Sequence, residues 1–183
     1  MEKAALKEHR RHSTADKPFS YYISNIPEYF PNAPMHWHKE FELNVILEGE
    51  GDFVTGDIHF TAYKGDIVLT PPDMLHAVYQ HDDKRCVYDT LDLDGSMLGS
   101  RDNDRAADAF IAPLISGAYS IETHITPEHC YYSELLTTAE NMISAAKGDT
   151  PLLDMLIKSE LLRFMFPVSY THLRAHETDS YLV

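Results

Sequence analysis

The sequence is short of basic residues, of cysteine and of long apolar runs, and each shortage excludes a class of protein. Fifteen Lys and Arg residues against 29 Asp and Glu residues give a formal net charge of −14, so this chain alone is a poor binder of nucleic-acid phosphates. No segment reaches the roughly 18 apolar residues that a membrane span needs, and the charged first 17 residues hold no apolar signal-peptide segment. Two cysteines, Cys86 and Cys130, cannot form a disulfide framework. We therefore expect a cytoplasmic protein with reduced thiols and no membrane partner.

The chain does contain enough apolar material for a folded core. Hydrophobic residues make up 44% of its 183 residues and aromatic residues 11%, a composition that argues against wholesale disorder. The length fits one domain, or one domain with a fragment of a second.

Residues 19–93 have the pattern of short β-strands. Six segments rich in β-branched and aromatic residues alternate with Gly, Pro, Asp and Asn, and closely spaced turns favour an antiparallel sandwich or barrel. Within residues 41–47 one face is apolar, and it consists of Phe41, Leu43, Val45 and Leu47. The other face carries Glu42, Asn44 and Ile46, which suits a strand whose second face lines a pocket.

Helical patterns begin after residue 98. Residues 104–115 predict a short helix, and residues 119–125 predict one more strand. Thr126 is expected to cap a helix that has Pro127 at its first position and ends at Gly148, and a second helix is expected from about Pro151.

These patterns divide the chain into a flexible tail at residues 1–18, a barrel at 19–100, and a helical dimerisation and linker region with one additional strand at 101–167. The two amphipathic helices predict a dimer interface. The residues assigned to it are Leu135, Leu136, Met142 and Leu156. Packing of the same helices against the chain's own barrel is the alternative.

Histidine and glutamate side chains form the most informative cluster. His36 and His38 are spaced so that a strand can direct both rings to one face, and Glu42 and His76 follow. Imidazole nitrogens and a carboxylate oxygen suit a divalent ion such as zinc, iron, manganese or nickel. The sequence predicts that these four residues converge on one metal ion and, with Asn44, line a ligand-binding pocket. The alternative is a barrel lining in which they bond to each other or to a ligand without metal.

The spacing of this cluster resembles that of the cupins. His36, His38, Glu42 and Gly49 fit the first cupin motif, H-x-H-x3-E-x6-G. The second motif, G-x5-P-x-G-x2-H-x3-N, is matched at Gly65, Pro71 and His76, whereas Asp73 and Gln80 replace its second glycine and its asparagine. The resemblance implies a mainly β fold, an antiparallel jelly-roll (cupin) barrel followed by two or three α-helices, with the four side chains pointing inward.

A wider resemblance covers residues 19–166. This stretch looks like the sensor half of AraC-type transcriptional regulators, in which a metabolite-binding cupin barrel precedes a helical dimerisation pair. In that family a further C-terminal domain with two helix-turn-helix units binds DNA. The segment after Phe166 has no such pattern; residues 168–178, VSYTHLRAHET, resemble a translated sequencing adapter. We therefore expect residues 168–183 to be a non-native tail.

Three functions are compatible with these patterns. The resemblance favours the effector-sensing and dimerisation region of an AraC-type regulator, truncated before its DNA-binding domain, with a small molecule such as a sugar as effector and a second copy as partner. In that case the chain is not an enzyme, has no catalytic residues, and reaches DNA only through the missing domain. The complete set of metal ligands suits a small metal-dependent cupin enzyme of the isomerase or dioxygenase type. The third alternative is a stand-alone binding module.

Overall fold

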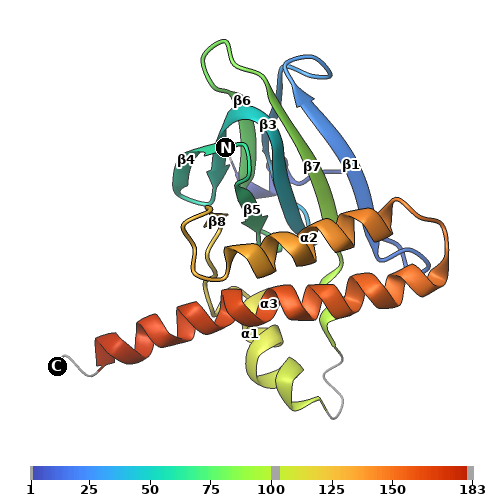
Figure 1. Cartoon of the computed structure of the whole chain (residues 1–183), viewed down its shortest axis with the longest axis vertical. Helices are drawn as coiled ribbons and strands as arrows, with labels where there is room; N and C mark the ends of the chain where they lie inside the picture. The colour runs from blue at the N-terminus through green and yellow to red at the C-terminus, as the bar shows by residue number, and fades with distance from the viewer. Residues whose placement is uncertain (1, 100–103, 181–183) are drawn as a thin grey trace.

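Antiparallel strands curve into a barrel, and two helices lie across one face of it (Figure 1). The computed structural model describes the backbone of residues 2–99 and 104–180, and the side chains of that part up to residue 169. The strands are β1 (Phe19–Ile26), β2 (Asn32–His36), β3 (Phe41–Thr55), β4 (Ile58–Tyr63), β5 (Ile67–Thr70), β6 (His76–Gln80), β7 (Cys86–Leu93) and β8 (His124–Ile125). The mainly β barrel predicted from the sequence is confirmed.

Strand β3 is the element that closes the barrel. Its first half pairs with β5 and β7, and its second half pairs with β4 and β6, all antiparallel. The main path of the sheet runs β1-β7-β3-β5-β8, and β2 joins through β6. Because one 15-residue strand belongs to both sides, the sheet bends round on itself.

The barrel strands separate two apolar cores, one on each face. On the outer face, Phe41, Leu43 and Val45 are buried together with residues of the helices. On the inner face, Ile46 packs in a smaller cluster with Tyr88 and residues of β5 and β6. The alternation predicted for residues 41–47 is confirmed for residues 41–46. Leu47, expected on the apolar face, is 38% exposed, at the point where the pairing of β3 with β7 shifts register.

The helices are η1 (Lys3–Leu6), η2 (Gly95–Leu98), the π-helical η3 (Ala107–Ile111), α1 (Ala112–Ile115), α2 (Tyr132–Ala146) and α3 (Pro151–Ser180). The predicted start of α2 at Thr126 is wrong. The Thr126 hydroxyl donates to the Glu128 carboxylate, and the backbone N–H groups of His129 and Tyr132 close two successive turns before the helix begins. Within the described residues, no helix combines the length and apolar character needed to cross a bilayer.

Helices α2 and α3 pack on each other and on the outer face of the sheet (Figure 1). Leu135 and Met142 of α2 are fully buried in this layer, and Leu136 is partly buried against it. Leu135 and Met142 were expected in a dimer interface, but in the structure both side chains pack in the chain's own core. Leu156 of α3, in contrast, is 40% exposed.

Helix α3 continues through Pro167 to Ser180, and Val168 is buried against the same core. A non-native origin of residues 168–183 stays a prediction, and residues 181–183 lie outside the described part of the chain. The predicted boundary between barrel and helical region, at residues 100 and 101, also falls outside it.

Residues 1–18 were expected to form a flexible tail, but the described part of this segment, residues 2–18, contacts the barrel. The backbone of Lys7 forms an isolated bridge with Trp37, whose indole Nε1 donates to the carbonyl of Lys3 at 2.7 Å. His12 is buried, with its ring nitrogens 2.8 Å from Glu8 and 2.7 Å from Asp92 of β7. Polar contacts to side chains distant in sequence hold this segment, so its local composition could not predict its position.

Candidate ligand and metal site

Strand pairing brings the four predicted metal ligands together at one opening of the barrel. His36 ends β2 and lies directly opposite His76, the first residue of β6. Glu42 is the second residue of β3, and His38 lies in the short connection before that strand. One ligand atom from each of these four residues lies within 4.8 Å of all the others. The structure thus confirms that they converge.

Backbone hydrogen bonds orient two of the histidines. The Nδ1 atom of His36 lies 2.7 Å from the carbonyl oxygen of Pro34, and that of His76 lies 2.9 Å from the carbonyl oxygen of Met74. A carbonyl oxygen only accepts, so both Nδ1 atoms carry the proton. With Nδ1 protonated in this way, Nε2 is the atom that keeps the lone pair whenever the ring is neutral, the arrangement that second-shell contacts impose on metal-binding histidines.

Asn44 fixes the carboxylate from the same face of β3. Its amide donates to Glu42 Oε1 at 2.7 Å, and its carbonyl oxygen accepts from the hydroxyl of Thr90 at 2.7 Å. The other carboxylate oxygen, Oε2, lies 3.4 Å from His76 Nε2 and 3.5 Å from His38 Nε2. Glu42 is therefore held with one oxygen toward the histidines.

Glu42 and His76 shift each other's pKa. Burial by itself would lower the pKa of His76, but the facing Glu42 carboxylate raises it. Burial by itself would raise the pKa of Glu42, but the facing His76 and His38 hold this pKa well below its usual range. Burial lowers the pKa of His36, and the neighbouring His76 lowers it further. The site accordingly combines an anionic carboxylate with a neutral imidazole at His36.

Three further residues at the opening were not identified from the sequence, namely Glu8, His12 and Asp92. Both ring nitrogens of His12 face carboxylate oxygens, so both carry a proton. Burial lowers the pKa of His12, but the hydrogen bonds with Asp92 and Glu8 raise it to about 11. Burial raises the pKa of Asp92, and the charge of Glu42 adds to this effect. Alternation in β7, which places Tyr88, Thr90 and Asp92 on one face, is the signal that could have revealed Asp92.

A cavity of about 310 Å³ opens beside this cluster. Its walls include Tyr22 of β1, His36, Glu42, His76 and Asp92, and residues of the N-terminal segment. Two buried atoms of its lining residues, His76 Nε2 and Asp92 Oδ1, have no hydrogen-bond partner within the described part of the chain, and neither has Nδ1 of His38, which lies beside Glu42. Because buried polar atoms are rarely left without partners, these atoms indicate a place for a ligand or an ion.

The residues fit a divalent ion. Three imidazoles and one carboxylate are a ligand set used by zinc, iron, manganese and nickel. Since one ligand atom from each of the four residues lies within 4.8 Å of the others, His36, His38, Glu42 and His76 would hold such an ion. The protonated Nδ1 atoms of His36 and His76 already orient the rings for this.

The antiparallel barrel with histidines and a glutamate at its opening defines the chain as a cupin. The sequence model of the AraC-like ligand binding domain matches residues 17–165. The chain therefore belongs to the AraC-like ligand-binding family.

One curated relative is the HTH-type transcriptional regulator YdeC of Bacillus subtilis, 27% identical over 89 residues. This match covers 48% of the present chain and 31% of YdeC, so the chain corresponds to about a third of that relative.

Solved cupin structures are similar over part of the chain. A cupin protein from Bacteroides fragilis is 19% identical, with 45% of this chain and 71% of that chain covered and a TM-score of 0.41. Oxalate decarboxylase from Bacillus subtilis, a protein with Mn(II) centres, is 20% identical, with 43% and 22% covered and a TM-score of 0.37.

Proposed function

We propose that the chain is the effector-sensing and dimerisation region of an AraC-type, DNA-binding transcriptional regulator, and that a small sugar-like molecule binds in the barrel cavity. The observation that carries the proposal is a set of buried polar atoms without a hydrogen bond among the described residues, in a chain of the AraC-like ligand-binding family. His76 Nε2 and Asp92 Oδ1 belong to the cavity wall, and His38 Nδ1 belongs to a residue beside Glu42. A cavity of about 310 Å³ is within the lower range of small-molecule sites.

The ligand-contacting residues in this proposal are His36, His38, Glu42, Asn44 and His76. His36, Glu42 and His76 line the cavity and offer both donors and acceptors to the hydroxyl groups of a sugar. Asn44 and His38 lie against Glu42. A divalent ion, zinc, iron, manganese or nickel, belongs to the proposal as an occupant of His36, His38, Glu42 and His76. When bound, it would supply a Lewis-acidic contact for an oxygen of the effector.

Dimerisation is proposed through the outer face of α3. Leu152 and Met155 are 74% and 70% exposed, and Leu156 and Leu162 are about half as exposed. These four residues lie at helical spacing on one side of α3, opposite the buried Ile157 and Leu161. Of the predicted interface residues, Leu156 belongs to this stripe, Leu136 borders the core, and Leu135 and Met142 do not face outward.

Regulation would require that the effector bind two states of the protein with different affinity. The N-terminal segment contacts the cavity through Glu8 and His12, and α2 and α3 contact the sheet that forms its wall. In the parent protein, helix-turn-helix units outside this region would carry DNA binding, in the cytoplasm.

The test is binding of a panel of sugars and sugar derivatives to the purified chain by isothermal titration calorimetry, alongside a reporter assay with the parent regulator. We expect at least one compound to bind, and His38→Ala to weaken that binding about tenfold or more because it removes a buried polar contact. An exposed histidine, His59→Ala, is the matched control. A compound that fills the cavity without changing reporter output would contradict the sensor role.

The complete ligand set also favours a second candidate, a metal-dependent cupin enzyme of the isomerase or dioxygenase type. Metal-dependent turnover of a compound that binds in the cavity, lost in His76→Ala, would support it. Binding without turnover and without any regulatory effect would instead support the third alternative, a stand-alone binding module.

A further inference from the structure

A groove of about 470 Å³ lies next to the cavity at the opening of the barrel, and its lining is rich in basic residues. Lys7, Arg10 and Arg11 come from the N-terminal segment, and Lys39 comes from the connection before β3. The acidic side chains of the groove are Glu8 and Glu40. In a chain of net charge −14, four basic residues against two acidic ones is a local reversal of charge.

The two acidic groups of the groove are already engaged by other partners. The Glu8 carboxylate lies 2.8 Å from His12 Nε2 and 3.6 Å from His36 Nε2. The Glu40 carboxylate accepts a hydrogen bond from the Ser13 hydroxyl at 2.6 Å and lies 3.5 Å from His38 Nδ1. Neither carboxylate forms an ion pair with a lysine or arginine of the groove.

The basic side chains, in turn, have no carboxylate partner among the described residues; the Lys and Arg ion pairs of this part of the chain involve Arg85, Lys147 and Arg163 instead. Lys7 lies 5.3 Å from the centre of the Trp37 ring. The guanidinium of Arg10 lies 4.4 Å from the centre of the Tyr22 ring. Aromatic contacts thus position these cations while leaving their hydrogen-bond donors available.

Arg10 connects the groove to the cavity, since its side chain lines both. Tyr22, on which it rests, is a cavity wall residue and shares a contact of 3.2 Å with His12 Nδ1. The fork of N–H groups on an arginine recognises the two oxygens of a carboxylate or the oxygens of a phosphate. A ligand that fills the cavity would meet this fork at the cavity's entrance.

We infer that the effector is a small polyhydroxylated anion, a sugar acid or sugar phosphate, whose acidic group binds Arg10 while its hydroxyl groups face the histidines. This inference rests on the proposed sensor function. The carboxylates of Glu42 and Asp92 on the inner wall repel an acidic group, so the anion enters with its acidic end at the opening. The lysines and Arg11 of the groove add an attraction that salt weakens.

Paired ligands that differ only in the acidic group test the inference. Galacturonate with galactose and glucose 6-phosphate with glucose would each be titrated into the full chain by calorimetry at low ionic strength. We expect the acid of at least one pair to bind about tenfold to hundredfold more tightly than its neutral partner, as for a charge-assisted hydrogen-bonded pair. The two pairs separate carboxylate from phosphate recognition.

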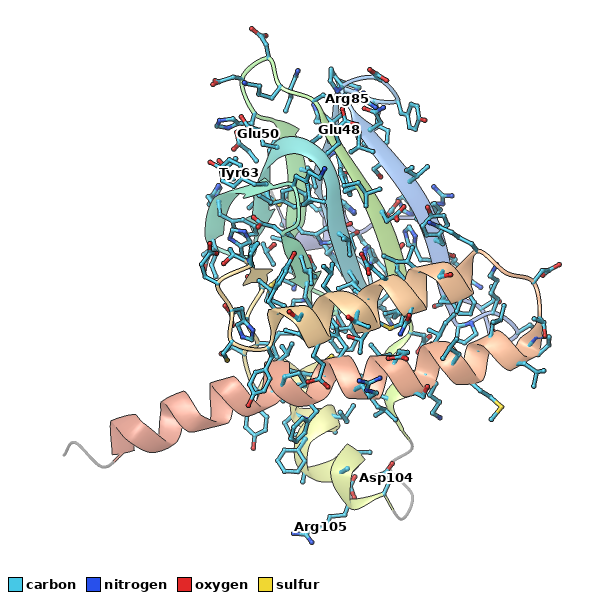
Figure 2. The ribbon with its side chains drawn as sticks, viewed as in Figure 1. Glu48, Glu50, Tyr63, Arg85, Asp104 and Arg105 are labelled. Carbon is cyan, nitrogen blue, oxygen red and sulfur yellow. The ribbon has the colours of Figure 1, made fainter. Side chains whose placement is uncertain are left out.

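Variants of Arg10 isolate its contribution. Arg10→Gln should abolish the preference for the acid, measured as the ratio of the affinities of the acid and the neutral sugar. Arg10→Lys should restore part of this preference because it keeps the charge but not the fork. Arg105→Gln is the control, because Arg105 lies on the helical segment that projects away from the barrel (Figure 2).

The possible results are distinguishable. If a neutral sugar binds as tightly as its acid, or if Arg10→Gln keeps the preference, the anion inference is overturned while the sensor proposal stands. If no compound of either kind binds, both fail. A preference that is lost in Arg10→Gln and kept in Arg105→Gln supports the inference.

Discussion

The two faces of the same barrel strands differ in how their buried side chains are stabilised: one face is packed with apolar residues, and the other holds polar atoms that lack hydrogen bonds within the described residues. On the outer face, alternate residues of β3 and β7, such as Leu43 and Leu91, are buried in an apolar layer with α2 and α3. On the inner face at the opening, Glu42 and Asp92 lie among histidines, and several buried polar atoms have no hydrogen-bond partner in the described part of the chain. An apolar layer lowers the free energy of folding wherever it is buried. Buried polar atoms without hydrogen bonds lower the stability of the fold. Their presence therefore indicates that this layer serves to bind a ligand.

Truncation within the outer layer should give the largest effect. We expect Leu135→Ala to lower the free energy of unfolding by about 2–5 kcal/mol, because a fully buried leucine loses contacts and leaves a cavity. Urea denaturation followed by circular dichroism measures the change. The ligand affinity of the protein that remains folded should be unaltered. A large loss of affinity would mean that packing on the outer face affects ligand binding on the inner face. Leu152→Ala, on the same pair of helices but exposed, is the control.

Removal of His12 should give a smaller loss that is confined to the barrel opening. His12→Ala leaves the buried Asp92 without its partner, at a cost of about 1–3 kcal/mol. We expect the N-terminal segment to detach more often, so that trypsin cleaves after Arg10 and Arg11 faster than in the unaltered chain. Mass spectrometry of a time course measures this rate. Equal cleavage rates would show that the ion pair does not hold the segment, and His59→Ala provides the matched change at an exposed site.

Charge on the outer face of α3 should alter assembly with little effect on folding. Leu156→Glu places a carboxylate within the exposed apolar stripe, where its effect on the free energy of unfolding should stay within about 0.5 kcal/mol. The mass from light scattering should fall from that of a dimer to that of a monomer. Lys158→Glu, an exposed change beside the stripe, should leave the mass as it is. An unchanged mass for Leu156→Glu would exclude this face as the interface.

The smallest expected effect is a difference in reaction rate between the two thiols. It tests the packing of the inner core without any substitution. Burial raises the pKa of Cys86 to about 12, so its thiolate is scarce at neutral pH, whereas Cys130 is exposed. We expect one fast-reacting thiol in the native chain and two after denaturation, measured with Ellman's reagent. Because the thiolate reacts, Cys86 should stay slow as the pH rises from 7 toward about 9. Two fast thiols in the native chain would mean that the inner core opens readily.

The barrel and its histidine–glutamate cluster, which depend on local sequence patterns, were predicted correctly, whereas features that depend on contacts between residues far apart in the sequence were not. Spacing in residues 36–42, together with His76, was sufficient to predict the cluster at the opening, because these positions match the two cupin motifs. His38, however, lies in the connection between β2 and β3 and not on a strand. The N-terminal segment was not predicted, since Glu8 and His12 are held by His36 and by Asp92 of β7, far away in the sequence. Apolar periodicity identified α2 and α3 but not which of their residues face outward, because a periodic stripe packs equally well on a barrel or on a second copy.

Strand alternation and motif spacing are local properties of the chain, so they were sufficient to predict the barrel, the inward face of β3 and the histidine–glutamate cluster. The folded structure was needed to show that Leu135 and Met142 belong to the core, that α3 keeps an exposed apolar stripe, and that the N-terminal segment brings Arg10 to the cavity. These outcomes depend on which distant surfaces meet, and burial and charge pairing between distant residues leave no periodic trace in the sequence.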